Sequence, residues 1–320
     1  MTGTAFRRRS CPLCGSSAAR EEVHSRLRAE SLVFDAVRPF WSGLFKEKLF
    51  FSYHRCGGCG LLYTPVFFDA DQLTELYAHM APNMDAVPGD AIGATQRGYY
   101  RHAERTAPLG GGYLEIGPDV GHLAEVAARR GGFDHFWLYE PNRAVHDTLR
   151  RAVGRHAITL STDMDDLSAV PDGTVGLAVM VHVLDHLLDP VAMLEKIRPK
   201  LRPDGLLMAV THNEGSLLRN VMGTRWPPFC LQHPELYNTA TLRRLMKRAG
   251  FARVSVRRSR NHFPLDFLLR QAAWTVGLKL PPLPFRSPTI GLRLGNMIAL
   301  ARPEAAQAAS RDPAVLERAA

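Results

Sequence analysis

Four of the five cysteines form two closely spaced pairs near the N-terminus. The pairs are Cys11-Pro-Leu-Cys14 and Cys56-Gly-Gly-Cys59, and a glycine follows each pair. Two residues between cysteines let both thiolates point at one ion from a tight turn, and two such turns supply the four sulfurs of a closed tetrahedral zinc site. The spacing therefore predicts a structural Zn²⁺ ion, with no open position for catalysis.

Disulfides, an iron–sulfur cluster and free thiols are the alternatives for these cysteines. Disulfides are rare in chains without an export signal, and iron–sulfur sites usually show other spacings. Residues 15–55 separate the pairs, and the apolar stretch 31–51 is expected to fill this gap with a helix or a long hairpin. The fifth cysteine, Cys230, is interpreted as a small buried apolar side chain.

Three histidines lie at the ends of apolar segments or in a polar loop, where a side chain could accept a proton from a substrate. His182 ends an apolar segment, His212 follows another, and His233 lies in the loop 223–237, which is rich in aromatic and hydrogen-bonding groups. A histidine near a reacting hydroxyl or acidic carbon can act as its general base. We expect His233 to be the first candidate for this role and His212 the second, with His182 in contact with ligand. The alternative for His233 is a surface loop stiffened by proline.

Strands and helices alternate from residue 112 onward. The predicted strands cover 113–117, 135–139, 157–161, 175–183, 205–211, 252–258 and 296–301, and the predicted helices cover 120–130, 142–152, 190–201 and 239–249. This alternation predicts a doubly wound parallel sheet with helices on both faces. Ligands of such sheets bind at the carboxyl ends of the strands, where the histidines also lie.

The turn after the first predicted strand points to a nucleoside-containing ligand. Its residues 115–121 read Glu-Ile-Gly-Pro-Asp-Val-Gly, and Glu140 ends the next strand, where a carboxylate can accept both ribose hydroxyls. A dinucleotide fingerprint would need glycines at positions 117, 119 and 122, but Asp119 and His122 occupy two of them. Aspartate tolerates a left-handed backbone, so Asp119 is compatible with the turn.

The glycine spacing and four later segments resemble class I S-adenosylmethionine-dependent methyltransferases. The later segments are Thr162-Asp-Met-Asp-Asp-Leu167, Val181-His-Val-Leu-Asp-His-Leu-Leu-Asp-Pro190, Leu201-Arg-Pro-Asp-Gly205 and Ala249-Gly-Phe251. Asp119 replaces the family's middle glycine, Asp185 its usual glutamate, and Gly176 an aspartate at the start of the fourth strand. The likeness covers residues 112–260. With the cysteine module in front, the chain resembles zinc-binding methyltransferases of small molecules, among them sugars and natural products.

This resemblance implies a Rossmann-like α/β fold with seven strands, the last of them antiparallel and supplied by residues 296–301. It also implies that S-adenosylmethionine is the cofactor, that Asp163 accepts from the adenine amino group, and that Tyr99 or Tyr100 closes over the cofactor. The residues expected to bind the cofactor are Glu115, Gly117, Asp119, Gly121, Glu140, Asp163, Met164, His182 and Tyr100.

We expect the chain to be organised in four parts. Residues 1–65 form a small zinc-ribbon-like module, in which the four cysteines Cys11, Cys14, Cys56 and Cys59 bind the metal. Residues 66–111 form a helical linker or lid, with a helix over 69–79 and a loop over 80–98. Residues 112–303 form the methyltransferase domain, with an apolar cap insertion over 261–290, and residues 304–320 form a tail.

The composition is that of an ordinary globular protein. The chain is 46% apolar and 22% charged, which excludes a disordered chain, collagen or a coiled coil. No run approaches the ~18 apolar residues of a membrane span, and no apolar segment of a secretory signal follows the basic start. We therefore expect a cytoplasmic protein. The net charge of +9 suits an anionic partner, but the basic residues are spread along the chain.

Three functions are compatible with the sequence. The first is methyl transfer from S-adenosylmethionine to an oxygen or carbon of a small molecule. The second is an RNA methyltransferase whose zinc module binds RNA. The third is an inactive cofactor-binding or scaffold protein. Asp119 and Gly176, which depart from the family pattern, favour this alternative.

Overall fold

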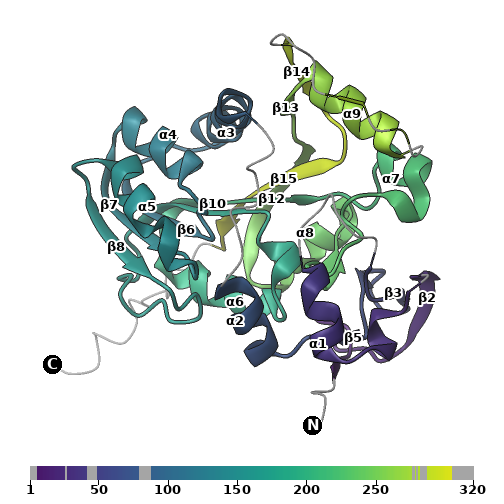
Figure 1. Cartoon of the computed structure of the whole chain (residues 1–320). Coiled ribbons are helices and arrows are strands. Elements are labelled where there is room, and N and C mark those ends of the chain that lie inside the picture. The colour runs from purple at the N-terminus through teal and green to yellow at the C-terminus, as the bar shows by residue number, and fades with distance from the viewer. Residues whose placement is uncertain are drawn as a thin grey trace, which may run out of the picture.

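The computed structural model of the protein (Figure 1) describes residues 6–25, 27–41, 49–78, 88–275, 278, 280–281 and 287–304. The predicted tail lies outside this part of the chain except for residue 304. Parts of the predicted cap insertion and of the predicted loop over 80–98 also lie outside it.

A seven-stranded sheet forms the centre of the fold. Its strands are β6 (Gly111–Ile116), β7 (Phe133–Tyr139), β8 (Ala157–Ser161), β9 (Val175–Val181), β10 (Leu201–His212), β12 (Phe251–Arg258) and β15 (Asn296–Pro303). Their order is β12-β15-β10-β9-β6-β7-β8, and β15 pairs antiparallel with both of its neighbours. The prediction of a Rossmann-like sheet whose last strand is antiparallel is confirmed. The carboxyl ends of six strands therefore meet at one edge.

Helices cover both faces of this sheet (Figure 1). The helices α3 (Gly89–Glu104), α4 (His122–Arg130) and α5 (His146–Val153) pack their apolar side chains on one face, and α6 (Pro190–Ile197) and α8 (Thr239–Arg248) pack on the other. The start of α6 is fixed by Asp189, whose side chain accepts from the backbone N–H of Ala192, and by Pro190 in the first turn. Asn238 starts α8 with a capping box.

The N-terminal module shares a sheet with a short strand from the second half of the chain. Its strands β2 (Ala19–Val23), β3 (Tyr53–Cys56) and β4 (Leu62–Tyr63) are joined by β11 (Glu235–Leu236), which pairs antiparallel with β4. A two-stranded sheet, β1 (Arg7–Arg8) with β5 (Val66–Phe67), adds to the module. The loop that contains His233 is therefore anchored by the module.

The stretch between the cysteine pairs holds short helical turns where the structure describes it. They are 3-10 turns at Ala29–Ser31 and Arg38–Phe40 and the helix α1 (Phe34–Val37). The next helix, α2 (Ala70–Ala78), lies within one residue of the predicted bounds. Residues 42–48 lie outside the described residues.

The loop predicted over 80–98 was wrong for its second half, where α3 begins at Gly89. Pro82, Pro88 and Gly89 pointed to a loop. Tertiary packing overrides this weak propensity, because Ala91, Ile92, Thr95, Tyr99 and Tyr100 are buried along one face of α3. Beyond β12, the described parts of the insertion form β13 (Asn261–Pro264), α9 (Leu265–Thr275) and β14 (Thr289–Leu292).

The helices of the described ranges are all too short or too polar to cross a bilayer.

Candidate functional site

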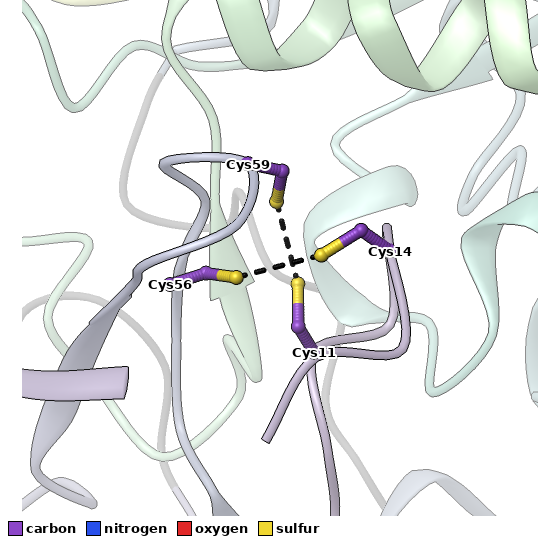
Figure 2. A group of neighbouring side chains, drawn as sticks. All are labelled: Cys11, Cys14, Cys56 and Cys59. Carbon is purple, nitrogen blue, oxygen red and sulfur yellow. Dashed lines mark hydrogen bonds between the residues drawn. The ribbon is translucent and has the colours of Figure 1, made fainter. Parts of the chain in front are cut away.

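The four paired cysteines converge on one point (Figure 2). The Sγ atoms of Cys11 and Cys59 are 3.5 Å apart, as are those of Cys14 and Cys56, and all four lie within 4.8 Å of one another. No disulfide joins them. In a tetrahedron with metal–sulfur bonds of about 2.3 Å, neighbouring sulfurs are about 3.8 Å apart. The cluster therefore has the ligand set and the size of a closed Zn²⁺ site.

Charged contacts tie this module to the loop around His233. Arg9 forms an ion pair with the buried Glu235. Arg55 donates to Glu214 at 2.6 Å, and Tyr53 donates its hydroxyl proton to the backbone carbonyl of His233 at 2.7 Å. Glu235 is fully buried, so its pairing with a guanidinium offsets the cost of burying a carboxylate. These contacts fix the loop against the module.

The turn after β6 keeps the backbone that a nucleoside ligand needs. Gly117 has φ 66°, and a Cβ atom there would lie 2.7 Å from Val183 Cγ2. Asp119 has φ 52°, so aspartate adopts the left-handed conformation in place of glycine. Gly121 has φ 83° and lies against Leu149 of α5. All three residues thus shape a tight turn at the carboxyl edge of the sheet.

Glu140 lies beside this turn and supports it. Its two carboxylate oxygens accept from the backbone N–H groups of Asp119 and Asn142, each at 2.9 Å. Each oxygen keeps a further lone pair that a ribose hydroxyl could use. Burial raises the pKa of Glu140, while these two hydrogen bonds act against the shift.

Glu115 is buried next to the same turn. Its Oε2 atom accepts from the hydroxyl of Tyr113 at 2.7 Å. Burial raises the pKa of Glu115 to about 8, since a low-dielectric surrounding disfavours the charged form. A cationic ligand group would reverse this shift.

The other predicted cofactor residues are placed differently. Asp163 is exposed after β8, and Met164 beside it packs against the core. Tyr100 is buried in the core with α4, whereas the hydroxyl of Tyr99 donates to Asn261 Oδ1 at 2.9 Å. Of the two tyrosines, Tyr99 thus points its polar end toward the carboxyl edge.

His182 and His212 meet where β9 and β10 end. Their ring centroids are 4.5 Å apart. His182 has φ 54°, a strained conformation for a non-glycine residue, and its Nε2 lies 3.3 Å from Asn296 Nδ2. Its Nδ1 is buried without a hydrogen-bond partner among the described residues. Burial lowers the pKa of His182, so the ring is neutral at neutral pH.

His212 is paired with a buried carboxylate. Asp185, which is fully buried, accepts from His212 Nδ1 at 2.5 Å and from the His212 backbone N–H at 3.3 Å. Burial lowers the pKa of His212, and Asp185 partly offsets this shift. Burial alone would raise the pKa of Asp185, but the His212 ring holds it well below its usual range. With Nδ1–H committed to Asp185, the Nε2 atom of His212 is left as a proton acceptor.

Both ring nitrogens of His233 already have neighbours. Nδ1 lies 2.7 Å from the Pro228 carbonyl oxygen, and Nε2 lies 3.2 Å from Nε2 of His186. His186 in turn contacts the hydroxyl of Tyr77 in α2 at 2.8 Å. Burial acts to lower the pKa of His233, but the Cys230 sulfur and the Pro228 carbonyl raise it above its usual value. A histidine that holds its proton is a poor base.

The structure thus gathers His182, His212 and His233 into one cluster, in which His182 is half-buried and the other two are buried. The ring centroids of His212 and His233 are 4.9 Å apart. Sequence reasoning did not identify Asp185, Asn296 or Tyr77 as part of this cluster. Asp185 stands in the motif next to His186, and this was its only signal. Asn296 and Tyr77 come from distant elements and gave none.

The chain is similar to a known protein family and to many solved structures. Residues 94–256, just over half of the chain, match a family model described as "Methyltransferase domain". No curated protein matches the chain. Several hundred solved chains do, as expected for a widespread fold.

Three of these solved structures show the degree of likeness. One is a chain of the complex between the Haloferax volcanii Trm112 methyltransferase activator and a methyltransferase, with 16% identity, 67% of this chain and 94% of that chain covered, and a TM-score of 0.47. A Thermotoga maritima SAM-dependent methyltransferase has 17% identity, coverage of 67% and 91%, and a TM-score of 0.45. One from Leishmania major has 12% identity, coverage of 72% and 81%, and a TM-score of 0.48.

The family match runs from within α3 into β12 and covers the turn at Gly117, Glu140 and the three clustered histidines. The strand order and the antiparallel last strand agree with it. The chain therefore belongs to the family of class I S-adenosylmethionine-dependent methyltransferase domains.

Proposed function

We propose that this protein transfers a methyl group from S-adenosylmethionine to an oxygen or carbon of a small molecule. The observation that carries the proposal is the order of groups along one edge of the sheet. The glycine turn and Glu140 follow β6 and β7, and the His212–Asp185 pair follows β10 and β9, the next strands in the sheet. A cofactor site and a proton acceptor are thus neighbours.

The residues of the turn fit the cofactor. The positive φ of Gly117 leaves its backbone bare, and Glu140 offers lone pairs for a ribose. Glu115, buried with a raised pKa, fits the cofactor's ammonium group, and Asp163 fits its adenine amino group. When bound, S-adenosylmethionine supplies an electrophilic methyl group. What the chain supplies is orientation and a place for a proton.

His212 is the general base of this proposal. It accepts the proton of the acceptor's hydroxyl or acidic carbon on Nε2, while Asp185 keeps Nδ1–H fixed and stabilises the imidazolium that forms. His233 and His186 hold the loop beside it and connect it to Tyr77. We therefore place His212 before His233, although the sequence favoured the reverse order.

The cysteine cluster has a structural role in this proposal. A Zn²⁺ ion on Cys11, Cys14, Cys56 and Cys59 would fix the module's turns, and β4 of the module pairs with β11, next to His233. The metal thereby supports one wall of the site from outside. It takes no part in the chemistry, because four sulfur ligands leave no open position.

Two paired arginines of the module favour a small acceptor over RNA, while Arg7, Arg8 and Arg20 of the module are exposed. Arg9 is paired with Glu235, and Arg55 with both Glu22 and Glu214. Guanidinium groups that are neutralised within the protein are not free for a phosphate backbone. The RNA and scaffold alternatives stay open to test.

The test is transfer of label from methyl-labelled S-adenosylmethionine to a pool of small metabolites, compared with transfer to total RNA. We expect a labelled small product with the wild type and a loss of product with Glu140→Gln. The control Glu125→Gln changes a half-exposed carboxylate of α4 and should keep the activity. Label that enters RNA alone would establish the second alternative, and a folded protein that labels nothing in either pool would favour the third.

A further inference from the structure

A pocket of about 310 Å³ lies between α3 and the segments at the end of β12 and the start of β13. In Figure 1, α3 and β13 stand next to each other on the same side of the sheet. The pocket is lined by the arginines Arg101, Arg105, Arg258, Arg260 and Arg293. They come from three stretches of sequence that are far apart, so the fold assembles this concentration of positive charge.

Among the described residues, no acidic side chain lines this pocket. None of its five arginines forms an ion pair in the described part of the chain, whereas other arginines, such as Arg55 and Arg129, do. Guanidinium groups stay charged at every physiological pH. No acidic side chain of the described residues compensates the repulsion between the five guanidinium groups. An anion in the pocket would reduce this repulsion.

Two histidines complete the lining, His102 and His262. The Nδ1 atom of His262 is buried and has no hydrogen-bond partner among the residues described. The backbone N–H of His262 donates to Oγ1 of Thr95 in α3 at 2.8 Å, and this bond holds His262 against that helix. Burial and the surrounding arginines lower the pKa of both histidines, so each offers a neutral ring with one N–H donor. Either ring can donate its N–H to an anionic oxygen.

The pocket adjoins the candidate active site. Tyr99 lines it, and the Tyr99 hydroxyl interacts with Asn261 and Asn296. Asn296 contacts His182 and stands opposite His212 in the β10–β15 register, and Arg258 stands opposite the next residue, Met297. Along the edge of the sheet, the cofactor residues thus lie on one side of the histidines and the arginines on the other.

We propose that this arginine pocket binds the diphosphate group of the methyl acceptor, which makes the acceptor a diphosphate-linked small molecule. Planar guanidinium groups bind phosphate oxygens in pairs, and five of them match the multiple charges of a diphosphate better than a single carboxylate. Five guanidinium groups around a volume of about 310 Å³ suit a compact group with several charges, whereas an extended polynucleotide needs a continuous basic track. The proposal rests on the proposed methyl transfer, but anion binding can be measured without it.

The test is calorimetric titration of the full chain with inorganic pyrophosphate at low salt. The double variant Arg258→Gln/Arg260→Gln should weaken binding by about tenfold or more, because charge-assisted hydrogen bonds are lost. The matched control Arg243→Gln/Arg248→Gln removes two exposed charges from α8 and should change binding by less than about twofold. Thermal unfolding checks that both variants fold.

Each outcome bears on one proposal. No binding by the folded wild type, or equal weakening in the two double variants, would overturn the pocket as a diphosphate site. A short single-stranded RNA that binds more tightly than pyrophosphate, and loses this binding in Arg258→Gln/Arg260→Gln, would overturn the small-molecule assignment. Titration with S-adenosylhomocysteine is run in parallel: its failure in the wild type, with pyrophosphate binding intact, would count against methyl transfer and leave the anion site standing.

Discussion

Asp185 and His212 are separated by 27 positions in the chain, yet Oδ2 of Asp185 lies 2.5 Å from Nδ1 of His212. The pairing brings the turn after β9 against the end of β10 and fixes which ring nitrogen carries the proton. In the proposed reaction, this contact leaves Nε2 of His212 as the atom that accepts the proton.

The first prediction concerns this pair. His212→Asn and Asp185→Asn should lower the rate of methyl transfer by about 10²–10⁴-fold, the range found when a general base or its orienting carboxylate is lost. Binding of S-adenosylhomocysteine should stay within about twofold of the wild type, since neither residue is assigned to the cofactor. The rate should fall by much less in His233→Gln. A loss in His233→Gln as large as in His212→Asn would reverse the assignment.

The second prediction concerns Glu115 and pH. Its pKa is raised to about 8 by burial, so the folded protein retains a proton that the unfolded chain releases above its ordinary pKa. The stability that this retained proton contributes is therefore fully present below the pKa of the unfolded chain. It is lost as the pH rises toward 8, and the free energy of unfolding falls by about 1.4 kcal/mol per pH unit. The uncharged variant Glu115→Gln should lack this loss.

Urea unfolding of the cofactor-free protein at pH 6, 7 and 8 measures the effect. The stability of Glu115→Gln relative to the wild type should rise across this series. Glu125→Gln, which changes a half-exposed carboxylate, should show a constant difference. A constant difference for Glu115→Gln as well would mean that Glu115 is ionised in the folded protein.

The third prediction concerns the metal. Elemental analysis should find one zinc per chain, and Cys14→Ser should lose it and lower the unfolding temperature by roughly 10 °C, because structural zinc contributes directly to folding. Cys230→Ser, the control, should keep the metal. Asp185 and two histidines also lie close enough to hold an ion. A second metal equivalent that disappears in Asp185→Asn would contradict the proton-accepting role proposed for the His212–Asp185 pair.

The fourth prediction concerns Asp119. Because φ is 52°, alanine at this position keeps the steric cost of a left-handed residue and glycine removes it. Asp119→Gly should therefore be more stable than Asp119→Ala by about 1 kcal/mol, measured by urea unfolding. Equal stabilities would show that the turn relaxes when the aspartate is replaced.

The sheet could be predicted because its signals are local. The strand at 157–161 was predicted with its observed bounds, and the helix that begins at Pro190 was predicted with its observed start. The helix α3 was missed because glycines and prolines outweighed its buried stripe. That stripe, with Ala91, Thr95 and Tyr99 four positions apart, was the available signal.

The site could be predicted only as separate pieces. The turn at Gly117, Glu140 and the strand-end histidines were visible as residue types at the expected places. Which histidine meets Asp185 depends on how two loops pack, and no spacing in the sequence encodes it. The arginine pocket was hidden for the same reason, since three stretches of chain contribute to it and each alone resembles a solvated surface.

Cofactor binding is the central claim, and calorimetric titration of the zinc-loaded wild type with S-adenosylhomocysteine, repeated with Glu140→Gln and Glu125→Gln, tests it most directly. We predict micromolar binding by the wild type and by Glu125→Gln, and a loss of about tenfold or more in Glu140→Gln, since an acceptor for the ribose is impaired. Absence of binding by a folded, zinc-loaded wild type would contradict the cofactor site and, with it, the proposed methyl transfer.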